Sequence, residues 1–114
     1  MAKKLTIPEH PMVVHSNLRT FEIKHKVMEG ADGKLEFDES IMYLNPNQQT
    51  ISLYKQTLLH ELLHIVYELV GMDPEEEEDM PKYTNEFLVT VSTNTIMLLA
   101  SMNQELFEFI FSKD

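Results

Sequence analysis

One segment, residues 50–70, constrains the fold most strongly because it predicts a long helix that is apolar on nearly every side. Apolar side chains recur there at the helical spacings of three and four, at Leu58, Leu59, Leu62, Leu63, Ile65, Val66 and Leu69. Such a helix has to be covered by other parts of the chain. A chain of 114 residues supports one core, so we expect a single domain over residues 1–114 with this helix at its centre.

The chain before this helix predicts short strands. Around Phe21 and Ile23, apolar and charged side chains alternate with a period of two, which is typical of a strand with one buried face. The predicted strands span residues 12–15, 19–28, 34–37 and 40–44, and the glycines of residues 29–33 provide a turn between two of them. We therefore expect an α+β fold that begins with a small antiparallel N-terminal sheet, three or four strands arranged as a meander.

Two more helices are expected after the central one. Gly71 stands where a glycine would end the central helix, and residues 72–82 read as a loop. A second helix is predicted from about Tyr83 to Met102 and can pack antiparallel to the first. A short helix over residues 104–111 follows, with Asn103 as its expected N-terminal cap.

The central helix carries the sequence His60-Glu61-Leu62-Leu63-His64. Because residues four apart lie on one helical face, both imidazoles can reach the same metal ion. Glu61 is displaced around the helix but stays beside that face, so it can hold a water on the metal instead of binding the metal itself. Zinc lowers the pKa of a bound water, and a neighbouring carboxylate can remove its proton. The pattern predicts His60 and His64 as zinc ligands and Glu61 as a general base.

A catalytic zinc needs a third protein ligand and an open position for water. Glu86 is the favoured candidate, since it lies in the first turn of the predicted second helix, far enough after His64 for the loop to reverse the chain. The alternative is that Glu86 is a carboxylate favoured by the helix dipole. Glu68 lies about 12 Å along the helix from His60, too far for one ion to bind both. Poorer candidates are Asp73, Asp79 and the strand-region histidines His10, His15 and His25.

Composition excludes several classes of function. The chain has 9 Lys and Arg against 19 Asp and Glu, a net charge of −10, so nucleic acid and anionic membrane surfaces are not expected partners. It has no cysteine, which excludes thiolate zinc sites and cysteine nucleophiles. No apolar run follows the basic pair near the N-terminus, and the longest apolar stretch, residues 96–100, is too short to span a bilayer. We expect a cytoplasmic protein.

The run from Thr57 to His64, followed by an acidic residue that opens a second helix, resembles the zincin-type metallopeptidases. More narrowly, it is similar to small HExxH proteins of phages and prophages, which resemble minimal gluzincins distantly similar to the ImmA/IrrE and SprT-like families. The resemblance implies zinc held by His60, His64 and Glu86, with Glu61 as the catalytic base. It also implies an edge strand that pairs with extended substrate, and residues 40–44 stand where that strand is expected.

The expected function is a zinc-dependent metallopeptidase-like hydrolase, in which zinc-activated water attacks a peptide carbonyl of a peptide or protein substrate. Two alternatives stay open. One is a catalytically silent, metal-stabilised protein-binding module, which the short chain favours and the intact Glu61 opposes. The other is a metal-free helical interaction domain, which requires both motif histidines to be incidental.

Overall fold

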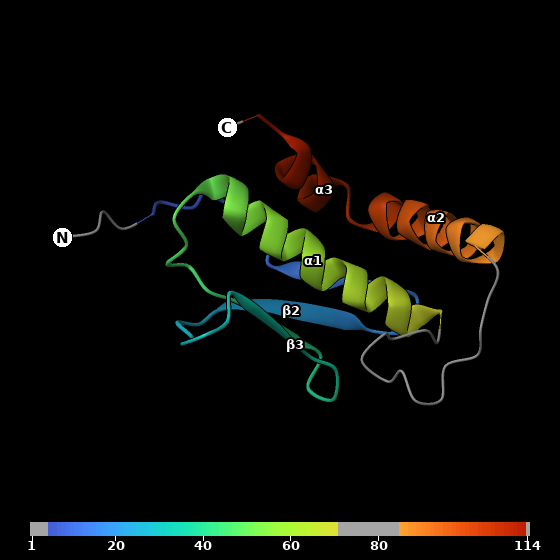
Figure 1. Cartoon of the computed structure of the whole chain (residues 1–114), viewed down its shortest axis with the longest axis horizontal. Helices are drawn as coiled ribbons and strands as arrows, with labels where there is room; N and C mark the ends of the chain where they lie inside the picture. Colours follow the sequence, from blue (N-terminus) through green and yellow to red (C-terminus); the bar gives the residue numbers. More distant parts are fainter. Residues whose placement is uncertain (1–4, 71–84, 114) are drawn as a thin grey trace.

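The computed structural model describes residues 5–70 and 85–113, with side chains in the second helix described from Val89 onward. Strands and helices follow one another as β1 (Val13–His15), β2 (Thr20–His25), β3 (Gly33–Glu36), β4 (Ile41–Leu44), α1 (Ile51–Leu69), α2 (Asn85–Met102) and α3 (Gln104–Phe111). Helix α1 lies across one face of the sheet, and α2 and α3 cover the side of α1 that faces away from the sheet (Figure 1). The predicted α+β class is confirmed, and each predicted element is found with slightly different ends.

The sheet is mixed, so the expected antiparallel meander is wrong. The strand order is β1-β2-β4-β3, and β2 pairs in parallel with β4, with Glu22 opposite Ile41 and His25 opposite Leu44. The other two pairs are antiparallel. The reason lies in the composition of the strands: β4 places Met42 and Leu44 fully inside the core and takes an interior position. Strand β3 carries charged side chains and takes an edge, where charge discourages further pairing.

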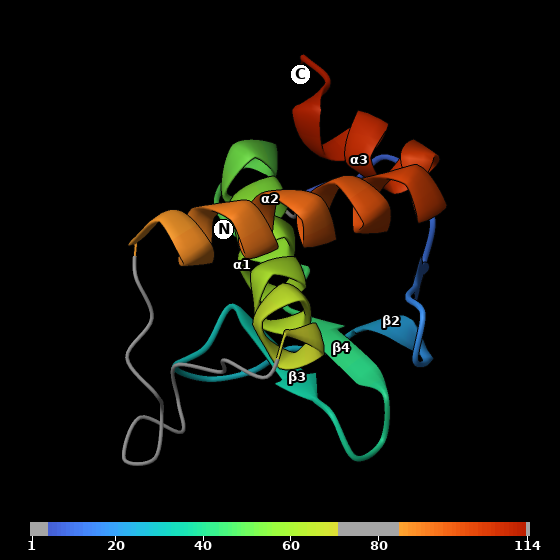
Figure 2. The ribbon, with the colours of Figure 1, turned by 90° about the vertical axis from the view of Figure 1, so that its right-hand side faces the viewer.

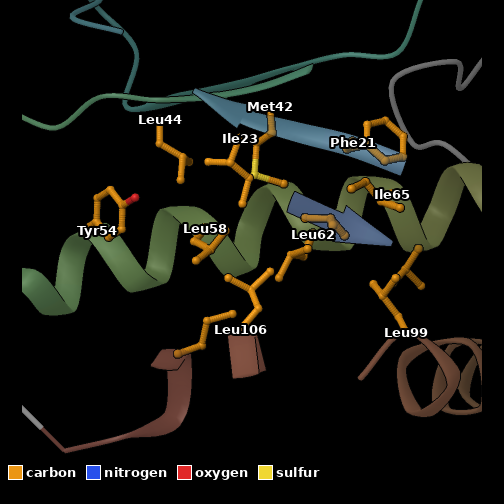
Figure 3. Packing of buried hydrophobic residues seen from close by; sticks show 13 residues of the cluster. Phe21, Ile23, Met42, Leu44, Tyr54, Leu58, Leu62, Ile65, Leu99 and Leu106 are labelled. Carbon is orange, nitrogen blue, oxygen red and sulfur yellow. The ribbon is translucent and has the colours of Figure 1, made fainter. Parts of the chain in front are cut away.

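The core lies on both sides of α1. On the sheet side its apolar residues pack against Phe21, Ile23, Met42 and Leu44, and on the other side against Leu99 of α2 and Leu106 of α3 (Figure 3). The helix itself contributes buried apolar side chains at Tyr54, Leu58, Leu62, Ile65 and Val66. Thr50 caps its N-terminus, accepting a hydrogen bond from the backbone N–H of Leu53 at 3.1 Å. The predicted central helix is therefore confirmed, although seven of its 19 residues, fewer than half, are buried.

Two details of packing differ from expectation. Strand β2 ends at His25, three residues before the predicted end at residue 28, and Val27 is 65% exposed. Helix α2 crosses α1 steeply and does not lie antiparallel along it; it starts on the side of α1 where the chain enters β3 and ends on the side of β2 (Figure 2). None of the helices in residues 5–70 and 85–113 has the length and hydrophobicity needed to cross a bilayer.

Asn103 joins the helical layer to the sheet. It occupies the N-cap position of α3, as expected, but its side chain makes no capping hydrogen bond. Its Oδ1 accepts from the backbone N–H of His15 at 2.7 Å, and its Nδ2 donates to the carbonyl oxygens of His15 and Leu99 at 2.7 and 2.8 Å. This side chain is only 6% exposed. It therefore fixes the α2–α3 corner against the edge strand β1.

We predict that Asn103→Ala lowers the free energy of unfolding by about 2 kcal/mol, because it leaves buried backbone groups without their partner. Urea denaturation followed by circular dichroism measures the change. Asn17→Ala, at an exposed position in the β1–β2 turn, is the matched control and should be close to neutral. Equal midpoints for the two variants would show that the Asn103 contacts add no stability.

Candidate metal centre

His60 and His64 lie one turn apart on the same face of α1, as their spacing predicts. Their ring centroids are 5.0 Å apart and the rings meet edge to face, with an interplanar angle of 78°. His60 is exposed and His64 is half-buried. The pair therefore stands at the surface of α1, at a separation that lets both imidazoles turn toward one ion.

Glu61 is turned away from solvent although it adjoins the exposed His60. It is 6% exposed and lies against the start of β3. A Cβ placed on Gly33 would stand 3.1 Å from Glu61 Oε2, 3.2 Å from Glu61 Cγ and 2.7 Å from Thr57 Cγ2. The carboxylate therefore fits beside β3 only because residue 33 has no side chain.

Sequence reasoning missed this role of Gly33. It assigned both glycines of the 29–33 turn to backbone freedom, and Gly30 does have a positive φ of 76°. Gly33 instead begins a strand and supplies space. A glycine at a strand position marks a close approach by another part of the chain, but the predicted strand began only at residue 34.

His60 and Glu61 form part of the wall of a pocket of about 340 Å³. The pocket lies between the start of β3 and the first turns of α1. Its other lining residues are Ala31, Asp32, Gly33, Leu53, Gln56 and Thr57. A space of this kind next to a histidine and a carboxylate can receive a side chain of a bound molecule.

The strand expected to lie at the edge is interior. Residues 41–44 form β4, which is paired with β2 on one side and β3 on the other, so it has no free edge for a substrate. The edge strand beside the motif is β3. Sequence reasoning placed it wrongly because it assumed that strands consecutive in the chain are neighbours in the sheet.

The register of β3 shows which backbone groups face its outer edge, on the side away from β4. Asn45 N–H donates to the Asp32 carbonyl at 2.8 Å, and Lys34 lies opposite Tyr43. Because hydrogen-bonded and non-hydrogen-bonded positions alternate in an antiparallel pair, Lys34 directs its backbone groups toward β4. The N–H and C=O groups of Gly33 and Leu35 then point outward, on the side away from the sheet.

The third ligand stays a prediction. Glu86 is the second residue of α2, in its first turn as expected, but its side chain lies outside the described residues. Within the described part of the chain, no group of three His, Asp or Glu side chains is placed to hold a metal ion. The exclusion of Glu68, which was based on helical geometry, likewise stays a prediction.

The other candidate ligands divide into two sets. His10 and His25 are both hydrogen-bonded to the hydroxyl of Tyr54, and His15 lies on β1. Asp73, Asp79 and the acidic run around them lie outside the described residues, as does Gly71. The geometry thus brings together His60, Glu61 and His64 and leaves the strand-region histidines elsewhere.

No family model, curated protein or solved structure matches this chain. The resemblance to zincins therefore depends on the motif residues. The positions of His60, Glu61 and His64 on α1, and of β3 beside them, are the geometric observations that bear on the site. They place the three motif residues beside one edge of the sheet.

We predict that Gly33→Ala destabilises the fold by about 1–3 kcal/mol, because the added methyl overlaps Thr57 and Glu61. Thermal denaturation measures the loss. In a Thr57→Ser background, which removes the nearest methyl, part of the stability should return, while the displacement of Glu61 remains. Wild-type stability for Gly33→Ala would mean that this close approach is easily relieved.

We also predict that His60→Ala, His64→Ala and Glu86→Ala each weaken zinc binding by at least about tenfold to a hundredfold, the cost of losing even an outer partner of a metal ligand. Glu68→Ala, the matched control on the same helix, should bind zinc like the wild type. Calorimetric titration with zinc measures the four affinities. Loss of binding in Glu68→Ala, with none in Glu86→Ala, would reverse the assignment of the third ligand.

Proposed function

We propose that this protein is a zinc-dependent hydrolase of peptide bonds, with His60, His64 and Glu86 as zinc ligands and Glu61 as the general base. The observation that carries the proposal is the arrangement on α1. Two imidazoles share one face of the helix, and a buried carboxylate next to them is turned toward an edge strand. If the two histidines had no common role, there would be no reason for a buried carboxylate beside them.

The residues present suit zinc. Imidazole nitrogens and one carboxylate are a common ligand set for catalytic zinc, and the 5.0 Å separation of the His60 and His64 rings is compatible with two of the three ligands. When bound, zinc supplies a Lewis acid that polarises a carbonyl and lowers the pKa of water to about 7. The exposure of His60 leaves that side of the site accessible to a substrate.

Glu61 performs the proton transfers in this proposal. Its carboxylate accepts a proton from the attacking water and delivers it to the nitrogen of the departing amine. Gly33 packs against the side chain and restricts its movement, so little conformational freedom is lost when the substrate binds. The contact with β3 thus orients the base as well as burying it.

The outer edge of β3, which pairs with no other strand among the described residues, favours an extended peptide as the substrate. A peptide paired with the outward-facing N–H and C=O groups of Gly33 would pass next to Glu61, since the two residues are in contact. The adjacent pocket of about 340 Å³ can receive one of its side chains. The net charge of −10 favours peptides with basic residues.

Substitution of the base separates a catalyst from a binder. Glu61→Gln keeps the size and hydrogen-bonding reach of the side chain but cannot take a proton at neutral pH. We expect it to bind one zinc per chain with wild-type affinity and to cleave peptides at least about 10²-fold more slowly. Cleavage is measured by mass spectrometry on a peptide library, with both proteins loaded with zinc.

The outcomes distinguish the alternatives. Equal cleavage by the wild type and Glu61→Gln would show that the activity comes from a contaminating protease or another site. Zinc binding by both, without cleavage by either, would favour the metal-stabilised binding module. Absence of zinc binding by the wild type would favour the metal-free interaction domain.

A further inference from the structure

A second cluster of polar residues lies at the other end of α1, away from the motif. The hydroxyl of Tyr54 is 2.7 Å from His10 Nε2 and 2.7 Å from His25 Nε2. The three residues come from different segments: the stretch before β1, the end of β2, and the first turns of α1. Tyr54 is fully buried and stands at one end of the apolar cluster (Figure 3). The cluster therefore ties the N-terminal stretch, residues 7–12, to the core.

Hydrogen-bond chemistry fixes the direction of this chain. His10 Nδ1 is 2.8 Å from the carbonyl oxygen of Pro11, which only accepts, so Nδ1 carries the proton. In neutral His10, Nε2 is then an acceptor, and it receives the single proton of the Tyr54 hydroxyl. The hydroxyl oxygen in turn accepts from His25, whose Nε2 must carry its proton. With both imidazoles neutral, each of these three hydrogen bonds has one donor and one acceptor.

The hydrogen-bonded series His10–Tyr54–His25 can accommodate one added proton but not two. If His10 becomes an imidazolium, it donates to Tyr54, and the hydroxyl can turn to donate to His25 once that ring changes tautomer. If both rings are imidazolium ions, both donate to the Tyr54 oxygen, and neither ring can accept the hydroxyl proton. A buried hydroxyl without an acceptor is costly, and two like charges then face the same oxygen.

We propose that the His10–Tyr54–His25 chain is a pH-operated latch, which holds residues 7–12 against the core at neutral pH and releases them when both histidines are protonated. His10 also stacks on the ring of Phe109 in α3, with centroids 4.4 Å apart, so release would separate the N-terminal stretch from α3 as well. A pocket of about 770 Å³ lies at this junction, lined mainly by the same stretch together with His25 and Phe109. Release would remove one of its walls.

The charged side chains near His10 act on its protonation in both directions. Glu9 from the N-terminal stretch and Glu105 from α3 line the same pocket as His10, and their carboxylates favour a protonated ring. Lys55 from α1 opposes them, since its Nζ lies 5.1 Å from the centroid of the Phe109 ring against which His10 stacks. Strand β2 contributes His25 itself.

Burial has the largest effect on the pKa of both histidines. It is the main cause that lowers the pKa of His10 below its ordinary value of 6.5, with a smaller lowering from His25 and a partial offset from the Pro11 carbonyl. Burial also lowers the pKa of His25. It raises the pKa of Tyr54, so the hydroxyl keeps its proton throughout.

The sign of the pH dependence follows from these directions. The latched state binds fewer protons than the released state wherever the pH lies between the lowered pKa values and 6.5. The stability of the latch is therefore fully present above about pH 6.5 and is lost as the pH falls below it. Since two rings are involved, release takes up more than one proton, approaching two.

Amide hydrogen exchange tests this directly. The Ile23 N–H donates to the carbonyl of Met12 at 2.8 Å, so its protection factor reports whether residues 7–12 are attached. The Lys26 N–H, bonded to Leu44 at 3.0 Å, serves as a reporter of the sheet alone. Below about pH 6.5 we expect the protection of Ile23 to fall steeply while that of Lys26 stays constant. Parallel behaviour of the two amides would overturn the proposal.

Variants resolve the number of protons. His25→Gln keeps a donor and an acceptor beside Tyr54 but cannot be charged, so the pH slope of Ile23 protection should fall to at most one proton. Tyr54→Phe removes the shared hydroxyl, and Ile23 protection should be low and nearly independent of pH. His15→Gln, a substitution that does not touch the His10–Tyr54–His25 hydrogen bonds, should behave like the wild type. A wild-type slope in His25→Gln would exclude the two-proton latch.

Two further measurements make the result independent of variant folding and of the metal centre. Ring-proton resonances of wild-type His10 and His25 should titrate below pH 6.5, and ordinary titration of both would contradict the proposal. The exchange series is run with zinc and with a chelator, so that any effect of the metal centre on the exchange rates is seen separately. The slope difference between wild type and His25→Gln should be the same in both series, and its loss with either addition would assign it to the metal centre.

Discussion

The structure depends on one constraint, which is that α1 has to be covered on both sides. Its apolar residues extend around the helix, so a sheet alone or a helical layer alone would leave part of them in water. The four strands cover one side, and α2 and α3 cover the other. Burial on both sides also makes α1 a rigid support for the motif histidines, of which His60 is exposed and His64 half-buried.

Sequence patterns predicted the elements well because they are local. The period of three and four gave α1, and the alternation around Phe21 and Ile23 gave β2. The order of strands depends on which strand competes best for an interior position, and a period of two carries no information about neighbours. For this reason the parallel pairing of β2 with β4 was not predicted, and β4 was expected at the edge of the sheet, where β3 lies.

The candidate site was predictable to the same extent. Spacing within one helix placed His60 and His64 on a common face and Glu61 beside them. The contact between Glu61 and Gly33 joins residues from α1 and β3, and it depends on how the helix sits on the sheet. The partners of Asn103 and Tyr54 were missed for the same reason, since hydrogen bonds between distant segments leave no periodic signal in a sequence.

The parallel pairing of β2 with β4 has a consequence for the order in which the chain folds. Strands β3 and β4 are joined by a short turn, so they can pair early at a small cost in loop entropy. The pairing of β2 with β4 spans the whole β3 segment and closes a longer loop. The β3–β4 hairpin is therefore expected to form as a unit and to dock through β4 onto β2. Nucleation on this hairpin would bring Gly33 into place before α1 packs, so the gap that receives Glu61 would exist before the helix arrives.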